Sequence, residues 1–266
     1  GTQGGPVSAD ITSRTADRLY REGNWEEAVR EYDRAAEAAM DQSIFPLRYR
    51  AALVLQEQKQ YRQAAERLSR LALEFPQHGE APEAHLQAAW NWAQHLRGAT
   101  DEERESVSNR YVESLQQQIK TWPEHEAANQ ARAWLAVYLE QREDWKQAIA
   151  AYGDVENESP LYETALRGIA RIQQRRWSDA RRTNQTIDAE EVKAAADFFL
   201  QAARDAADDS RETASGVRAF ATITAAQYQL QLPAINYPLV EQLVRPLLAE
   251  KTLEVGESQA TAQSLL

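Results

Sequence analysis

The chain contains no cysteine among its 266 residues. This absence excludes disulfide bonds, thiolate metal sites and cysteine nucleophiles. Glycine is also sparse, with ten residues, and they form neither a phosphate-binding loop nor a Gly-x-Ser-x-Gly nucleophile elbow. The longest apolar runs, such as Ala51 to Leu55, are far too short to span a bilayer. We therefore expect no direct membrane span.

The residues that dominate the chain are Ala, Gln, Glu, Arg and Leu, which favour helix nearly everywhere. Long runs of alternating Val, Ile or Thr are missing, so strands are not expected. Hydrophobic residues make up 43% of the chain, which is enough to build a substantial core. The composition therefore predicts an all-α fold.

The balance of charge is acidic, with 30 Lys and Arg against 41 Asp and Glu and a formal net charge of −11. An acidic chain does not follow a phosphate backbone, so nucleic acid is not an expected partner. An anionic membrane surface is disfavoured for the same reason. Protein or peptide partners remain.

A short pattern recurs along the chain. An aromatic residue is followed three positions later by Ala, four positions further by an apolar residue, and three further by another. The copies are Trp25, Ala28, Tyr32 and Ala35; Tyr61, Ala64, Leu68 and Leu71; and Trp145, Ala148, Tyr152 and Val155. Pro76, Pro123 and Pro160 follow the same rhythm, and such prolines separate one helix from the next.

This pattern resembles the tetratricopeptide repeat family, whose unit is an antiparallel helix pair of about 34 residues. The resemblance implies about twelve helices, in five to six pairs, stacked into a right-handed superhelix. It also implies small residues where the helices of a pair approach closely. These would be Ala16, Ala52, Ala89, Ala136 and Gly168 in the first helices, and Ala28, Ala64, Ala148 and Ala180 in the second.

The resemblance covers only part of the chain and implies a division into four segments. The chain opens without an initiator Met, and we expect a disordered or vector-derived leader there. After Trp177 the repeat fades, and helices are predicted at 188–207, 211–230 and 238–250, the last as a cap. The segments are the leader 1–8, clear repeats 9–160, degenerate repeats with the capping helix 161–250, and a C-terminal tail 251–266.

Two histidine-rich stretches invite a metal interpretation. Residues 75–85 read FPQHGEAPEAH, and 47 residues later the chain reads WPEHEAA. A His-Glu-x-x-His site needs its second histidine one helical turn on, and Asn129 stands there instead. In the first stretch Pro82 makes a regular helix doubtful, so His78 and His85 have no predicted common face. We interpret both stretches as boundaries between units, and we expect no metal, cofactor or catalytic residue.

The first helices are predicted to line a concave groove in this family. Trp90 and Trp134 lie outside the signature positions, whereas Trp25, Tyr61, Trp92 and Trp145 occupy them and are expected in the core. Helical spacing gives the groove candidates Tyr49, Arg50, Leu53, Gln87, Trp90, Gln94, Gln130, Trp134, Val137 and Gln141. Aromatic residues among Gln, Arg and Leu suit a peptide groove, but a Trp packed between neighbouring helices is an equal alternative.

A cluster of arginines forms a second candidate surface: Arg171, Arg175, Arg176, Arg181 and Arg182. Arginine binds carboxylates in a bidentate manner, which suits docking of an acidic partner. The alternative is a helix C-terminus whose positive charges offset the helix dipole.

These features predict a non-enzymatic scaffold that binds a peptide or protein segment in the concave groove of the repeats. One alternative is a structural spacer within a larger envelope or secretion assembly, and another is an all-helical enzyme. The boundary phrase resembles repeats of bacterial envelope and Tol–Pal-associated proteins, which favours a bacterial periplasm or envelope over the cytoplasm. The oligomeric state is left open.

Overall fold

The computed structural model describes residues 6–207, 211, 214–249 and 264–265, and within these residues every regular element is helical. The all-α prediction is confirmed for this part of the chain. Helix α1 begins at Pro6, so residues 6–8 belong to a helix rather than to the predicted leader. Most of the predicted tail lies outside the described residues.

The helices fall into two units, Gly1–Ala131 and Arg132–Leu266, which we call the N-terminal and C-terminal units. The N-terminal unit holds α1 (Pro6–Arg21), α2 (Trp25–Ala38), the 3-10 turn η1 (Asp41–Ser43), α3 (Ile44–Glu57), α4 (Tyr61–Glu74), α5 (Ala81–Gly98) and α6 (Asp101–Thr121). Helix α7 (Glu126–Gln141) contains the boundary. The C-terminal unit continues with α8 (Trp145–Gly153), α9 (Tyr162–Arg182), α10 (Ala189–Ala207), α11 (Ala214–Gln229) and α12 (Tyr237–Ala249).

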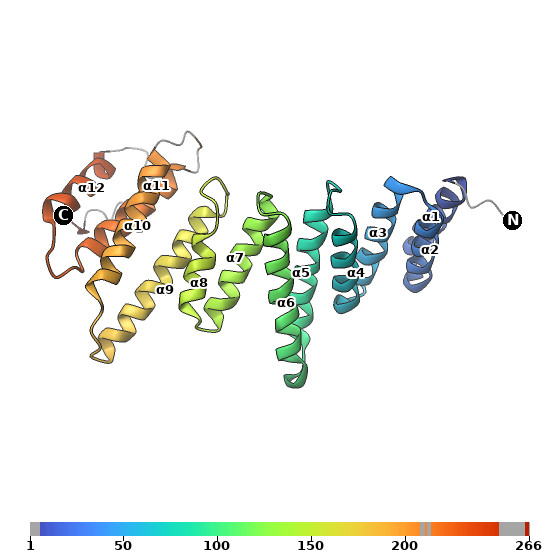
Figure 1. Cartoon of the computed structure of the whole chain (residues 1–266), viewed down its shortest axis with the longest axis horizontal. Helices are drawn as coiled ribbons and strands as arrows, with labels where there is room; N and C mark the ends of the chain where they lie inside the picture. The colour runs from blue at the N-terminus through green and yellow to red at the C-terminus, as the bar shows by residue number, and fades with distance from the viewer. Residues whose placement is uncertain (1–5, 208–210, 212–213, 250–263, 266) are drawn as a thin grey trace. The chain divides into compact units, whose positions relative to one another are not determined.

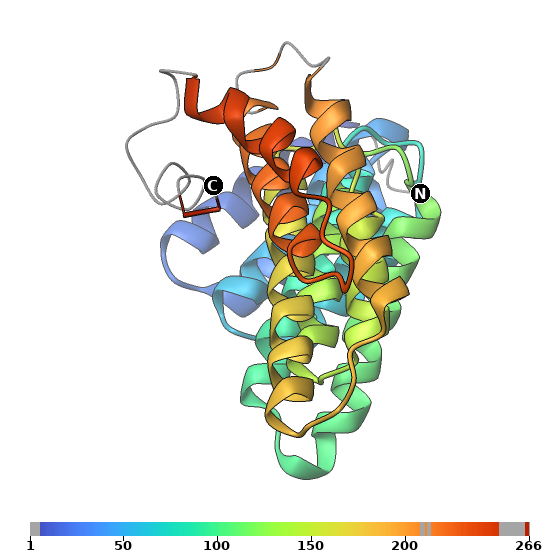
Figure 2. The ribbon, with the colours of Figure 1, turned by 90° about the vertical axis from the view of Figure 1, so that its left-hand side faces the viewer.

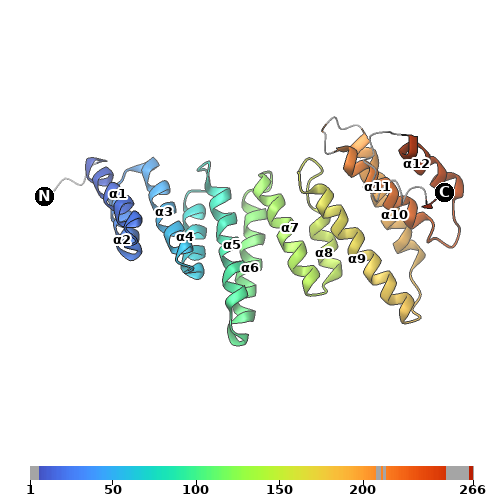
Figure 3. The same cartoon turned by 180° about the vertical axis from the view of Figure 1, so that it is seen from behind.

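Within each unit, most helices pack against a helix that is next to them in sequence. In the N-terminal unit this holds from α1 to α6, as Figures 1 and 3 show from opposite sides. In the C-terminal unit α8 packs on α9, α10 on α11, and α11 on α12. The last contact is visible in Figure 2, where α12 lies beside α11. The three helices predicted after residue 186 are confirmed, with ends within three residues of the prediction.

The turns inside the pairs share one backbone geometry. In four of them a single residue with positive φ follows the first helix: Gly23, Lys59, Glu143 and Asn184. Its amide donates to the carbonyl three residues back, and the next amide donates to the carbonyl five residues back, for example Lys59 to Gln56 and Gln60 to Leu55. This Schellman arrangement satisfies the last carbonyls of the helix. Asn184 repeats this turn between α9 and α10, although the main packing partner of α10 is α11, which also contacts α9.

The turn between α5 and α6 is the exception, as the sequence indicated. Here Thr100 caps α6 through a capping box with Glu103. The Thr100 hydroxyl lies 3.0 Å from the Glu103 carboxylate, whose negative charge also suits a helix N-terminus.

Small residues stand where the paired helices approach most closely. Of the predicted positions, all five in the first helices are buried, as are Ala28, Ala64 and Ala148 in the second helices. Ala180 is only half-buried, so that prediction fails where the repeat fades. Gly168 shows that the need for a small residue also arises between successive pairs, because a Cβ placed on it would lie 2.5 Å from the Tyr152 ring of the preceding helix α8.

The aromatic signature residues are less buried than predicted. Trp92 is buried, but Trp25, Tyr61 and Trp145 are only half-buried at the starts of their helices. Trp25 and Trp145 pack against the core clusters of their units, and Tyr61 packs edge-on against Trp90.

Replacing Lys59 by Gly is expected to raise the free energy of unfolding by about 1 kcal/mol, because glycine adopts the left-handed conformation without steric cost. Urea unfolding followed by circular dichroism measures the change. Gln58→Gly is the control: Gln58 has a negative φ of −76°, so the same substitution brings no gain. Equal effects of the two variants would contradict the argument from backbone strain.

Replacing Gly168 by Ala is expected to destabilise the chain. The added methyl meets a Tyr152 ring that is itself buried, and overpacking of this kind costs about 1–3 kcal/mol, more than the gain in helix propensity of about 1 kcal/mol. Gly98→Ala is the matched control, since open space surrounds that position. A fall in melting temperature for Gly98→Ala as large as that for Gly168→Ala would contradict the explanation.

Candidate functional site

The groove candidates of the N-terminal unit follow the register of their helices. Arg50 and Gln87 stand two residues before the buried alanines Ala52 and Ala89, and Leu53 and Trp90 stand one residue after them. Each pair therefore occupies equivalent positions on α3 and α5. Tyr49, Gln94 and Gln130 complete the N-terminal set.

Several of these polar side chains join neighbouring first helices. Arg50 on α3 reaches Asp17 on α1, with 3.4 Å between the charged atoms. The side-chain amide of Gln87 on α5 donates to the side-chain oxygen of Gln56 on α3 at 2.7 Å. The side-chain amide of Asn91 donates to the same oxygen at 2.7 Å. These polar candidates therefore serve at least partly to hold α1, α3 and α5 together.

The apolar candidates keep accessible surface. Trp90 packs edge-on against Tyr61, with ring centroids 6.0 Å apart, yet stays half-buried. Leu53, one register step away on α3, is also half-buried. The Tyr49 ring stacks on Phe45 at 6.2 Å, and burial, with smaller contributions from two nearby glutamates, raises the pKa of its hydroxyl. The ring contact of Trp90 is thus with the second helix α4 rather than with a neighbouring first helix.

The remaining candidates lie on the second half of α7, in the C-terminal unit. Trp134 is half-buried, Gln141 is exposed, and Val137 is 42% exposed, unusually high for a large apolar side chain. Trp134 occupies the register of Gln87, and Val137 that of Trp90. Each unit thus presents its own apolar first-helix residues.

The arginine cluster is largely paired within the chain. Arg171 holds Glu140 in a bidentate contact of 2.6 and 2.7 Å, and this contact lowers the pKa of the Glu140 carboxyl. The other contacts join Arg175 to Glu143, Arg176 to Glu191 and Arg182 to Asp179, whereas Arg181 contacts the Trp177 carbonyl and the Gln231 side chain.

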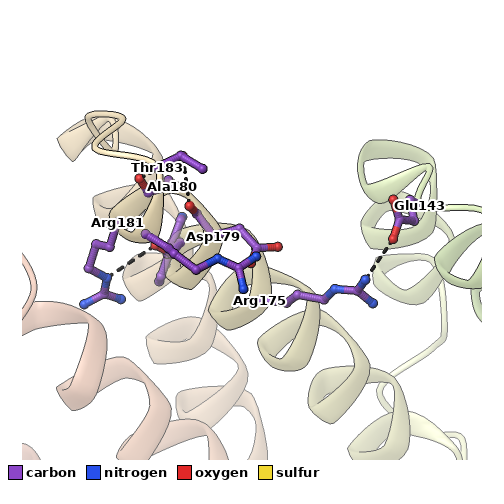
Figure 4. Close-up of polar contacts among 8 residues, drawn as sticks. Glu143, Arg175, Asp179, Ala180, Arg181 and Thr183 are labelled. Atoms are coloured by element: carbon purple, nitrogen blue, oxygen red, sulfur yellow. Dashed lines mark hydrogen bonds and ion pairs between the residues drawn. The ribbon is translucent and has the colours of Figure 1, made fainter.

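Figure 4 shows how the cluster ends α9. Arg175 extends toward Glu143 at 2.8 Å, while Arg181 turns back to the helix. The Thr183 hydroxyl donates to the Asp179 carbonyl at 2.9 Å and so caps the last turn. Arg175 also lies over the Trp145 ring, 4.9 Å from its centroid. Internal pairing accounts for most of the cluster, and docking of an acidic partner there stays a prediction.

The two histidine stretches adopt one turn, repeated 47 residues later. The His78 amide donates to the Phe75 carbonyl and the His125 amide to the Trp122 carbonyl. In both turns the ring Nδ1 accepts from the amide two residues on, at 3.2 Å for His78 and 3.1 Å for His125. The Trp122 indole donates to the Pro76 carbonyl at 2.9 Å and links the two turns. The stretches lie between α4 and α5 and between α6 and α7, which confirms that they separate one helix pair from the next.

His85 lies on α5 and His78 in the turn before it, so the expectation that they share no helix face is confirmed. Pro82 lies in the first turn of α5, where proline is tolerated, so the helix is regular and His85 has a fixed orientation. Its side chain is fully buried. Its Nδ1 lies 3.0 Å from the side-chain oxygen Oε1 of Gln118, and its Nε2 lies 3.2 Å from the Ser69 hydroxyl. Burial lowers the pKa of His85 to about 4, although the hydrogen bond to Gln118 opposes this shift. The neutral ring therefore links α4, α5 and α6.

The sequence analysis missed an apolar groove in the C-terminal unit. It has a volume of about 660 Å³ and lies among α8, α9 and α10, with Trp145, Ile149, Ile169, Ala194 and Phe198 among its walls. Phe198 is 37% exposed, while its neighbour Phe199 is fully buried. The adjacent phenylalanines were the available signal, because consecutive helical residues cannot both face one core.

Within the described residues, no three His, Cys, Asp or Glu side chains come together in a metal-binding arrangement. In the same part of the chain, no helix combines the length and apolar character needed to cross a membrane.

Solved structures similar to this chain are tetratricopeptide repeat proteins of bacteria. A protein of Bacteroides fragilis NCTC 9343 is 13% identical, with 97% of this chain and 99% of that one covered and a TM-score of 0.45. One from Parabacteroides merdae ATCC 43184 is 10% identical over 97% and 99%, with a TM-score of 0.43. A thermophilic one from Thermus thermophilus is 11% identical over 90% and 99%, with a TM-score of 0.38. No protein-family model and no curated protein matches the chain.

The His85 network predicts a stability that falls with acid. The folded pKa of about 4 lies below the ordinary 6.5, so the unfolded chain binds the proton more readily. The contribution of the neutral His85 ring to the free energy of unfolding is complete above pH 6.5. It is lost as the pH falls toward 4, by at most about 3 kcal/mol. Unfolding in urea between pH 7 and 4 measures this slope. His85→Gln is expected to flatten it, while His95→Gln, outside the network, keeps it; an unchanged slope in His85→Gln would refute the assignment.

Proposed function

We propose that the chain is a non-enzymatic interaction scaffold that binds a peptide or protein segment of a partner on the first-helix face of its N-terminal unit. The observation that carries the proposal is the equivalent placement of Leu53 and Trp90, which keep accessible apolar surface on adjacent first helices. Accessible aromatic and aliphatic anchors beside polar groups are typical of interaction hot spots.

The polar contacts beside these anchors support a preformed face. The Asp17–Arg50 and Gln56–Gln87 contacts tie the first helices together before any partner arrives. A partner would then bind without ordering these helices, and preorganisation of this kind favours affinity. The repeat architecture adds support, because stacked helix pairs form extended surfaces.

A scaffold role also agrees with the use of the histidines. His78 and His125 stabilise turns, and His85 is fully buried with both ring nitrogens engaged. A buried histidine with a pKa near 4 is poorly matched to general acid–base catalysis at neutral pH.

The first-helix face is tested by photocrosslinking from position 53 in native lysate, followed by identification of the partner and measurement of its affinity. We expect Leu53→Ala with Trp90→Ala to weaken binding at least tenfold, because hot-spot anchors each contribute more than about 1 kcal/mol. Leu73→Ala is the matched control, since Leu73 is 42% exposed on the second helix α4. Unchanged affinity in the double variant, with helical content intact, would refute the proposed face.

A further inference from the structure

The second helices share one register, so their surface positions can be compared. The buried residues of α4 and α10 coincide after a shift of 131 residues: Ala64, Ala65, Leu68, Leu71 and Ala72 match Ala195, Ala196, Phe199, Ala202 and Ala203. By this shift Arg67 of α4 corresponds to Phe198 of α10.

Helices α2 and α8 coincide in the same way after a shift of 120 residues. The shift matches Trp25 with Trp145, and the buried Ala28 and Tyr32 with the buried Ala148 and Tyr152. It also matches Asp33 of α2 with Gly153 of α8. The groove between α2 and α4 can therefore be compared, residue by residue, with the groove between α8 and α10.

In the N-terminal unit a groove of about 510 Å³ lies at the equivalent place, with Trp25, Val29 and Arg67 among its walls, and an ion pair bridges the helices beside it. Arg67 donates to both oxygens of Asp33, at 2.8 and 2.9 Å, and so bridges α2 to α4. The next groove, between α4 and α6, carries Ser69 and Arg110 at the corresponding positions, and both are polar. Polar or charged side chains thus stand at these positions in both grooves of the N-terminal unit.

In the C-terminal unit the ionic pair is replaced by a residue without a side chain and by an aromatic ring. Gly153 and Phe198 both line the groove of about 660 Å³, and Phe198 remains 37% exposed. Open space surrounds Gly153, where no heavy atom would come within 4 Å of an added Cβ. Helix α8 is also short, with nine residues against fourteen in both α2 and α4. The groove therefore has Gly153 and an apolar ring at the two positions where the N-terminal unit has an ion pair.

The charges at the rim indicate what the occupant carries. Glu143 is paired with Arg175, Glu191 with Arg176, and Asp144 accepts from Gln147. Among the described residues that line the groove, Lys146 is the one charged side chain without such a partner. A carboxylate on the occupant would complete this set.

We propose that the groove formed by Trp145, Ile149, Gly153, Ile169 and Phe198 is a second docking site, which takes an amphipathic helical segment of a partner protein. Its apolar side chains pack against the exposed ring of Phe198 and the neighbouring apolar wall, and its carboxylate pairs with Lys146. An amphipathic helix is the natural occupant because it presents apolar and acidic side chains from one segment. The site extends the scaffold role to a second surface and a stated partner chemistry.

The test uses the full chain and three synthetic peptides of 18 residues with leucines at helical i, i+3, i+4 spacing. The other positions carry Glu, Lys or Ser. Methyl NMR of Ile149 and Ile169 reports binding. We expect the Leu/Glu peptide to shift these signals and to bind at least tenfold more tightly than the Leu/Lys peptide.

Two variants address the two parts of the site. Gly153→Asp with Phe198→Arg recreates the ionic pair of the N-terminal unit and is expected to weaken the Leu/Glu peptide at least tenfold. Lys146→Glu is expected to remove the preference for the Leu/Glu peptide over the Leu/Lys peptide. Leu73→Arg is the control for a new arginine at an exposed apolar position outside the groove, and it should leave binding unchanged.

Three outcomes would overturn the inference: no shift of Ile149 and Ile169 with the Leu/Glu peptide, unchanged binding in the double variant, or equal binding of the acidic and basic peptides. Sedimentation velocity tests whether a second copy of this chain occupies the groove. Self-association that is lost on Phe198→Arg would assign the groove to a second copy and refute the partner segment. Leu53 and Trp90 belong to the other unit, so the two proposals can fail separately. A negative peptide experiment does not refute the first-helix face, and unchanged affinity in the Leu53 and Trp90 variant does not refute the groove.

Discussion

Close approach of packed helices is the constraint on which the rest of the structure depends. Each first helix from α1 to α9 carries a buried Ala or Gly, and at Gly168 of α9 even one methyl group would collide with Tyr152 of the preceding helix α8. Once the crossing residue is fixed, the helical period decides which side chains face the partner helix and which face outward. The equivalence of Leu53 with Trp90, and of Arg67 with Phe198, follows from this single requirement. Differences at equivalent outward positions are then free to serve binding.

Electrostatics in this acidic chain is mostly local. Net charge is −11, yet the arginines of α9 are held by carboxylates on α7, on the turn that follows it and on α10. Exposed pairs of this kind contribute little stability individually, about 0–1 kcal/mol, but they fix which helix faces lie opposite one another. Where a charge of the groove rim has no such partner, as at Lys146, the surface differs from the rest of the unit.

Much of the fold could be predicted because its determinants are local. Proline positions, the aromatic–alanine spacing and helix-favouring composition predicted the helices and nearly all crossing residues. The buried contacts of His85 could not be predicted, because its partners Ser69 and Gln118 come from two other helices, α4 and α6. The groove beside Phe198 could not be predicted from one segment. It depends on Gly153 of α8 and Phe198 of α10, which are 45 residues apart in the sequence. Only the packing of the helices brings these two residues to the same groove.

The repeated histidine turn has a consequence for how such a chain can grow. Four equivalent backbone positions, 75, 78, 80 and 81, recur at 122, 125, 127 and 128 with the same hydrogen bonds. The segment between these two turns therefore begins and ends with the same backbone geometry. Tandem duplication of residues 78–124 would therefore insert a further helix pair without creating a new kind of turn. Since each pair in a stacked array contacts mainly its neighbours, length in such a chain can change while the joint between pairs stays the same.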